Sequence, residues 1–412
     1  DPFIQSIVTW SVAFHLLCTG EVESSIQAFK EAERVARQSG NLLVGMSSLC
    51  QLAELQMIKG NLKEAARIYE DAVQLSQQDN PREPLASAGM AYLGLGEVYR
   101  AWGQLDRATA YLYQGIELSL RWGELTAMDG YLSLAKISGS HHKPQEAQAF
   151  LQKVEDLTSK MNSLLVVEYI KSLRARFWLR YGPLEAAIEW SKQTTLDPTA
   201  FYFYNWLIYT NVIRLRIIQK DFAGAAQLLG ELAGLVEKYG GTRNLIEHLM
   251  LEALLFQAQH KNREALARLR EALLLAEPEG YISLFADEGP ALVALLKNFQ
   301  TSTPGRQSAS LQNYVTNILQ YVAEVSAETQ APQVRDTLSL PAPTPARVSN
   351  LLSEGEQRVL RLLAAGLSNA AIARELVLEV STVKTHLLHI YTKLDVHDRH
   401  AALARARALN LL

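Results

Sequence analysis

The stretch SNAAIARELVLEVSTVKTHLLHIYTKLDV, from Ser368 to Val396, decides the fold of the C-terminal end of this chain. Its first residue is a favourable N-cap, and three residues then share the inward face of a short helix: Ile372, Ala373 and Leu376. A tight turn at residues 377–379 leads into a longer helix that ends near Leu394. Two helices joined by such a turn predict a helix-turn-helix.

The longer helix has two different faces. Its inward face repeats apolar residues with a 3.6-residue period, centred on Val383, Leu387 and Ile390. The opposite and flanking positions are Ser381, Thr382, Lys384, Thr385, Leu388, His389, Thr392 and Lys393. These side chains suit the major groove of DNA, because Lys contacts guanine or phosphate and apolar groups contact the thymine methyl. Periodicity alone leaves open an ordinary amphipathic surface helix.

Two more helices flank this pair. Ser353 to Glu356 form a capping box ahead of an apolar run, and Gly366 ends the resulting helix. A last helix is predicted from about Asp398 to Leu409. Together, the four helices predict a small domain over residues 350–412.

This pattern resembles the LuxR-type DNA-binding domain. The matching residues are Leu352, Ser353, Glu356, Val359, Leu360, Leu362, Leu363, Ala364, Gly366, Ser368, Asn369, Ile372, Ala373, Leu376, Thr382, Val383, Lys384, His386, Leu387, Ile390, Tyr391, Lys393, Leu394, Val396 and Arg399. The third helix is the recognition helix in that family, so the resemblance implies that Thr382, Lys384, Thr385 and Leu388 face DNA. It also implies a dimer contact near the fourth helix, for which we expect Val396, Ala401, Ala404 and Arg405.

Three sites depart from the family pattern. Ala370 and Ala371 stand where Lys-Glu is usual, so polar contacts from the second helix are missing. Glu379 replaces a Ser or Thr, and although a carboxylate suits a helix N-terminus, it would lie near phosphates. Asp395 replaces a Gly, at a position where a left-handed conformation costs Asp little. We therefore expect weaker DNA affinity than the family pattern alone would give.

Composition places the chain among folded, multidomain proteins. It has 412 residues, 48% hydrophobic residues and a net charge of −3. From Asn350 onward, eight Lys and Arg face six Asp and Glu, so a weakly basic module follows an acidic body. No apolar run is long enough for a membrane span, and two cysteines, Cys18 and Cys50, predict no disulfide framework. We expect both to be small buried residues of a cytoplasmic protein. The start without Met suggests a fragment of a longer chain.

An internal repeat dominates the rest of the sequence. A turn residue is followed by a helix with a small residue near its start. The small residues are Ser25, Ala65, Ala108, Ala147, Ala186, Ala225 and Ala265, and they are separated by 40, 43, 39, 39, 39 and 40 positions. Each unit predicts two antiparallel helices, which must stack on their neighbours to bury their apolar faces.

The predicted fold is therefore all-α, with a tetratricopeptide-like solenoid of about seven helical hairpins ahead of the four-helix domain. We assign the sensor or interaction array to residues 1–300 and a capping helix region to 301–325. A Pro-rich, flexible linker is expected over 326–349, because bulky apolar residues are sparse there. A solenoid of this kind curves and presents a concave groove.

The array is rich in aromatic residues, above all between Phe201 and Tyr209. Two interpretations stand: a surface that stacks a ligand such as a sugar or heterocycle, or packing between helices, which is favoured. The many Glu and Asp pairs are interpreted as solvent-facing sides of helices.

The layout as a whole is similar to the large ATP-dependent MalT-like activators. In that family a nucleotide-binding region precedes the repeats, but no G-x-x-x-x-G-K-[ST] motif is present here. The resemblance implies no cofactor in this chain, with ATP bound by a further N-terminal domain. It implies double-stranded DNA as a partner, bound as a homodimer, and an inducer or regulatory protein at the array. RNA polymerase is a further expected partner, and no membrane is expected.

No catalytic constellation stands out. Neither a nucleophile elbow nor a Cys-His arrangement is present, and His386-x-x-His389 lacks a third metal ligand nearby. We therefore expect a regulator rather than an enzyme, with no metal and an unknown effector-binding site. The alternative is a tetratricopeptide-like scaffold whose main role is protein interaction.

Overall fold

The computed structural model describes the array almost completely and the C-terminal end in part. The described residues are 1–18, 21–77, 84–158, 164–196, 203–239, 241–302, 308–330, 354–364, 367–368, 372, 375, 387, 390 and 399–408. The chain forms two compact units, Asp1–Ala331 and Pro332–Leu412. The described part of the chain is helical and contains no strand.

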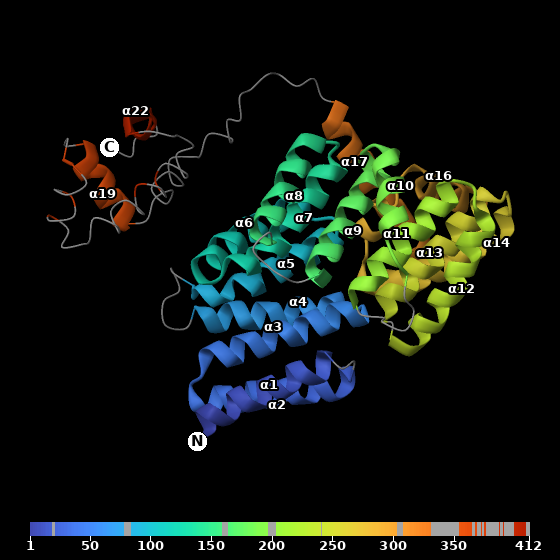
Figure 1. The fold of residues 1–412 in the computed structure, drawn as a ribbon. Helices are drawn as coiled ribbons and strands as arrows, with labels where there is room; N and C mark the ends of the chain where they lie inside the picture. The colour runs from blue at the N-terminus through green and yellow to red at the C-terminus, as the bar shows by residue number, and fades with distance from the viewer. Residues whose placement is uncertain are drawn as a thin grey trace. The chain divides into compact units, whose positions relative to one another are not determined.

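Seven helical hairpins follow one another in the first unit (Figure 1). They are α1 (Pro2–Cys18) with α2 (Val22–Ser39), α3 (Leu42–Lys59) with α4 (Leu62–Ser76), α5 (Gly89–Ala101) with α6 (Leu105–Trp122), α7 (Met128–Ser140) with α8 (Pro144–Thr158), α9 (Leu164–Tyr181) with α10 (Leu184–Gln193), α11 (Phe203–Ile218) with α12 (Phe222–Tyr239), and α13 (Thr242–Ala258) with α14 (Asn262–Ala276). Short 3-10 turns, η1 (Ala86–Ala88) and η2 (Glu124–Ala127), precede α5 and α7. The predicted all-α array of about seven hairpins is confirmed.

Left-handed turn residues set the register of the hairpins. Gly60, Gly103, His142, Lys220 and His260 all have positive φ where the first helix of a hairpin ends. Glycine adopts this conformation freely, whereas His and Lys do so at a steric cost. The small residue five positions further on begins the packed part of the second helix, and it is fully buried in these five hairpins, at Ala65, Ala108, Ala147, Ala225 and Ala265. Ser25 in the first hairpin is fully buried as well.

The fifth hairpin differs from its predicted register. Ala186 is only half-buried, whereas Ala187 is fully buried. The prediction matched the Glu-Ala pair of the other repeats, but the turn at Gly182 places Ala187 at the packed position. The prediction of Ala186 as the buried small residue of this hairpin is therefore wrong by one position.

The array closes on itself through two glycines. A Cβ on Gly60, at the end of α3, would lie 2.9 Å from Cβ of Thr242 at the start of α13. A Cβ on Gly241 would lie 2.0 Å from the carbonyl oxygen of Ile58. The second and seventh hairpins therefore meet directly, and only glycine at these two positions permits so close an approach. The predicted concave groove is thus enclosed on this side.

The residues after α14 do not form a simple end cap. They comprise η4 (Glu277–Glu279), α15 (Ser283–Ala286), α16 (Pro290–Ser302) and α17 (Ala309–Gln330). We call residues 277–288 the closing segment, because they return to the third hairpin. There the backbone N–H of Ile282 donates to the carbonyl oxygen of Ala101 at 2.8 Å. Helix α17 ends at Gln330, so it extends past residue 326, where the linker is predicted to begin.

Candidate DNA-binding unit and central cavity

The second unit has its own hydrophobic core. Helix α19 (Glu354–Ala364) contributes Val359, Leu360 and Leu363, and α22 (Arg399–Ala408) contributes Ala402 and Ala406. Ile372, Leu387 and Ile390, three of the predicted helix-turn-helix core residues, are buried in the same cluster. The backbone N–H of Ile372 donates to the carbonyl oxygen of Ser368 at 2.9 Å, which is the first turn of the helix predicted to begin there.

The DNA-facing residues lie outside the described residues. These are Ser381, Thr382, Lys384, Thr385, Leu388, His389, Thr392 and Lys393, and the core positions Ala373, Leu376 and Val383 are also outside. Of the predicted dimer contacts, Arg405 is exposed on α22, Ala401 and Ala404 belong to α22, and Val396 is outside the described residues. The roles of these residues stay predictions.

A central cavity of about 440 Å³ lies inside the array. The first helix of every hairpin from the second to the seventh contributes to its wall, together with the closing segment. Its lining is mixed, with apolar residues such as Met90 and Leu132 beside charged ones such as Glu54 and Lys136. The volume and the mixture of groups are those of a site for a small molecule.

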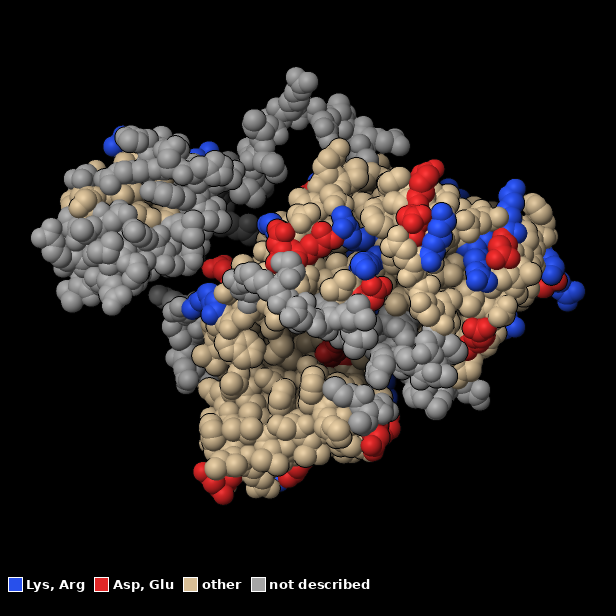
Figure 2. Space-filling model, viewed as in Figure 1, with Lys and Arg blue, Asp and Glu red and all other residues tan. Residues whose placement is uncertain are grey.

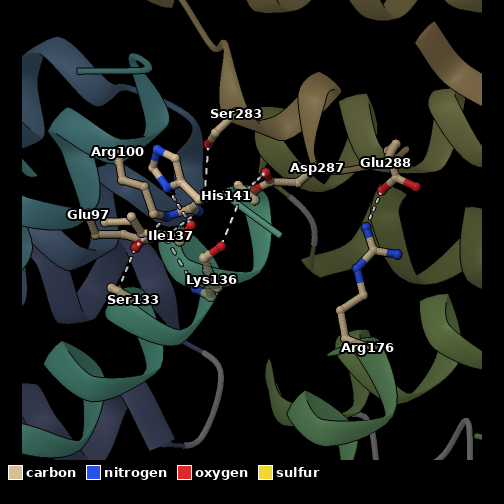
Figure 3. Close-up of polar contacts among 11 residues, drawn as sticks. Glu97, Arg100, Ser133, Lys136, Ile137, His141, Arg176, Ser283, Asp287 and Glu288 are labelled. Atoms are coloured by element: carbon tan, nitrogen blue, oxygen red, sulfur yellow. Dashed lines mark hydrogen bonds and ion pairs between the residues drawn. The ribbon is translucent and has the colours of Figure 1, made fainter. Parts of the chain in front are cut away.

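One polar network joins the closing segment to α5 and α7 (Figure 3). Arg100 donates to Glu97 at 2.8 Å, to Asp287 at 2.8 Å and to Ser283 at 3.1 Å. Burial opposes ionisation of Glu97, but the nearby cations Arg100 and Lys136 outweigh it, so the pKa of Glu97 is well below its usual range. The network is therefore charged at neutral pH.

A second network lies deeper. Arg214 donates to Glu247 at 2.7 Å and also contacts Glu288, and Arg176 donates to Glu288 at 2.7 Å. The Nε1 of Trp206 donates to Glu247 at 2.7 Å. Burial would raise the pKa of Glu247, but Arg214 and the neighbouring arginines lower it to about 2. Only 2% of the Glu288 side chain is exposed.

These networks correct the interpretation of the acidic residues as solvent-facing. Glu247 is buried and Glu288 has almost no exposed side chain. The signal was present in the sequence, since Arg214 and Glu247 each interrupt an apolar run, NVIRLRII and NLIEHLML. A charge at such a position needs a buried partner, but the sequence does not say which residue supplies it.

Glu54 differs from these paired acids. Water reaches its side chain within the cavity, yet protein surrounds it, and no cation pairs with it among the residues the structure describes. Desolvation and the carboxylate of Asp129 raise the pKa of Glu54 to about 7.

Two aromatic residues of the densest cluster are buried in the array. Tyr209 is 1% exposed and Trp206 is 5% exposed, with its indole bonded to Glu247. This agrees with the packing interpretation for these two residues. Trp206 also lines the cavity, so this residue belongs both to the packed interior of the array and to the cavity wall.

Cys50 is buried, and burial raises the pKa of its thiol to about 12; the side chain of Cys18 is outside the described residues. Across the described ranges, no three His, Cys, Asp or Glu side chains form a group that would hold a metal ion. Within the same ranges, the helices are too short or too polar to cross a bilayer.

Two family descriptions match the chain. The MalT-like TPR region matches residues 1–302, and the luxR family of bacterial regulatory proteins matches residues 350–406. Relatives include the HTH-type transcriptional regulator MalT of Yersinia pestis (strain Pestoides F) and that of Yersinia pseudotuberculosis (serotype O:1b, strain IP 31758). Each is 26% identical over 397 residues, which is 95% of this chain but 44% of the relative. The chain thus spans less than half the length of these relatives.

A solved tetratricopeptide repeat protein from Parabacteroides merdae is 12% identical, with a TM-score of 0.38. The match covers 78% of this chain and 99% of the solved chain. The family match spans most of the chain and agrees with the hairpins and the C-terminal core described above. The chain belongs to the family of the MalT-like TPR region, which matches residues 1–302, and its residues 350–406 match the luxR family of bacterial regulatory proteins.

Proposed function

We propose that this chain binds double-stranded DNA through its C-terminal unit and that an effector in the central cavity controls that binding. The observation that carries the proposal is the cavity of about 440 Å³, with its mixed apolar and charged lining, in an array that precedes a luxR-type domain. The name of the relatives, HTH-type transcriptional regulator MalT, supports the DNA-binding half of the proposal.

The partners follow from this proposal. The chain acts in the cytoplasm as a homodimer on DNA, with contacts at Val396, Ala401, Ala404 and Arg405. A weakly basic module binds a single half-site weakly, so pairing of two modules raises affinity. The effector is a small-molecule inducer or a regulatory protein, and RNA polymerase is contacted at the promoter. We propose that this chain binds no cofactor and carries out no catalysis of its own.

The test is selection of bound duplexes from a random pool by the whole chain, across a salt series. We expect one enriched motif whose affinity falls with salt. Lys384→Ala and Thr385→Ala should abolish the enrichment while the array stays folded. The matched control is Lys297→Ala, which removes an exposed cation on α16 and should leave binding unchanged. Enrichment that survives both recognition-helix substitutions would refute the assignment of that helix.

A scaffold is the second candidate, because α1 has an unusual outer face. Phe3, Ile4, Ile7, Val8, Val12 and Phe14 are all at least 42% exposed, and α1 contains no Asp, Glu, Lys or Arg. In Figure 2 charged side chains gather over α10 to α14, whereas the face of α1 to α4 that is visible in this view shows few of them. Exposed apolar patches of this kind are typical of protein interaction. If no DNA motif is enriched at low salt, the scaffold becomes the better account.

A further inference from the structure

The closing segment touches far more of the array than its length suggests. At its start, a Glu279 carboxylate oxygen accepts from the backbone N–H of Lys63 on α4 at 2.9 Å. The carbonyl oxygen of the same residue accepts from Nε1 of Trp102 at 2.9 Å. Together with the bond from Ile282 to Ala101, these contacts tie the segment to the second and third hairpins.

The other end of the segment is held by charge. Asp287 accepts from Arg100 on α5 at 2.8 Å and from the hydroxyl of Ser140 on α7 at 3.1 Å (Figure 3). Glu288 pairs with Arg176 on α9 and with Arg214 on α11. One short segment therefore bonds to the second, third, fourth, fifth and sixth hairpins. A change in the pitch of the superhelix must shift at least one of these contacts.

The cavity lies on one side of this segment. Ser283, Asp287 and Glu288 line it, and so do the arginines that hold them, Arg100 and Arg176. A molecule that enters the cavity meets the same side chains that fix the segment.

Helix α17 packs on the segment as well. The hydroxyl of Tyr314 donates to the carbonyl oxygen of Tyr281, and Ser310 donates to Glu277. Further along the helix, Tyr321 and Val325 form a small hydrophobic cluster with Ala286. Thus the closing segment contacts both the cavity and the last helix of the array.

We propose that the closing segment is the coupling element of this regulator: it exchanges its ionic contacts with Arg100 and Arg176 when the cavity is occupied, and it thereby changes the docking of α17. The proposal rests on the proposed function, in that the change is useful only if the cavity is a sensor. Its physical basis is a contiguous network in which each link is a bond between named groups. Ion pairs suit this role better than apolar packing, because a competing polar group can replace either partner.

The first test is amide hydrogen exchange on the full chain and its Asp287→Asn variant. Asparagine keeps the shape of the side chain but loses the charge held by Arg100. We expect exchange in Ala309–Gln330 to become about tenfold faster, although the substitution lies outside that helix. The control is Glu271→Gln on α14, which removes an exposed carboxylate paired with Arg268 and should leave α17 unchanged. Faster exchange in the closing segment with unchanged α17 would overturn the coupling.

A substitution on α17 tests the same coupling from the other side, and it keeps the proposal testable if the Asp287→Asn variant fails to fold. Tyr314→Phe removes only the hydroxyl that bonds to Tyr281. Because coupling between two sites is reciprocal, exchange in residues 281–288 should become several-fold faster. Unchanged exchange in the segment would show that α17 and the segment are independent, which contradicts the proposal.

DNA binding separates this inference from the proposed function. If the wild-type chain enriches a motif, Asp287→Asn should change its affinity for that motif by at least about threefold, without loss of folding. An unchanged affinity despite a loosened α17 would overturn the regulatory role of the segment. If no motif is enriched at all, the proposed function fails, whereas the exchange experiments still decide whether the segment couples to α17.

Discussion

The substitution Glu247→Gln removes one buried charge of the array. Glutamine keeps a single acceptor oxygen, whereas Trp206 and Arg214 donate to different carboxylate oxygens, so one of these two hydrogen bonds is lost together with the negative charge. A pKa lowered from the ordinary 4.5 to about 2 corresponds to about 3 kcal/mol of stability at neutral pH. The folded-state pKa lies below that of the unfolded chain, so this stability is present above pH 4.5. It is lost as the pH falls from about 4.5 to about 2.

The assay is urea unfolding followed by tryptophan fluorescence at several pH values between 7 and 2. At pH 7 the variant should be less stable than the wild type by about 3 kcal/mol. The difference should shrink steadily below pH 4.5, because the carboxylate of the unfolded wild type takes up a proton there, while that of the folded chain stays charged until about pH 2. Glu271→Gln, whose side chain is 49% exposed, should cost under about 1 kcal/mol at every pH.

Two results would refute this reasoning. A difference between wild type and Glu247→Gln that stays constant with pH would mean that lost packing, not charge, explains it. No difference at any pH would mean that the buried pair contributes nothing net, as occurs when desolvation cancels the Coulomb attraction.

Three further predictions concern the turns, the packed positions and the cavity. Gly60→Ala should destabilise the array by about 1–3 kcal/mol and raise its radius of gyration in small-angle scattering, because φ is 94° there and Thr242 leaves no room for a Cβ. Ala187→Leu should cost about 1–3 kcal/mol of unfolding free energy through overpacking, whereas Ala186→Leu should cost clearly less; equal costs would contradict the corrected register. Because the pKa of Glu54 is raised to about 7, the wild type should lose stability as the pH rises from 4.5 to about 7, and Glu54→Gln should flatten that decline in thermal unfolding.

The hairpins were predictable because they depend on local chemistry. A left-handed turn residue and a small residue five positions later recur along the chain, and both leave a trace in the sequence. The error at Ala186 arose because a Glu-Ala pair was weighted above the turn that sets the register. In the second unit, the apolar spacing of Ile372, Leu387 and Ile390 was sufficient to predict that they share one core.

What could not be predicted depends on contacts between distant parts of the chain. Nothing local to Glu288 indicates that Arg176 and Arg214 will hold it, since those residues precede it by many turns of helix. The closing segment falls within residues 1–300, which the sequence assigns to the array, and its Pro and Gly residues indicate only that the repeat is interrupted there. Its return to Arg100 is a property of the superhelical curvature, which no single repeat encodes.

The contact between Gly60 and Thr242 restricts how this array can evolve. An open solenoid can gain or lose a hairpin by duplication or deletion, because each hairpin touches only its neighbours. Here the second and seventh hairpins touch, so an added or deleted unit would move one partner away from the other. The number of repeats is therefore fixed by geometry, and variation within such arrays is expected in loop lengths and cavity side chains instead. The same contact also joins residues far apart in sequence, which should slow the last step of folding relative to an open array of equal size.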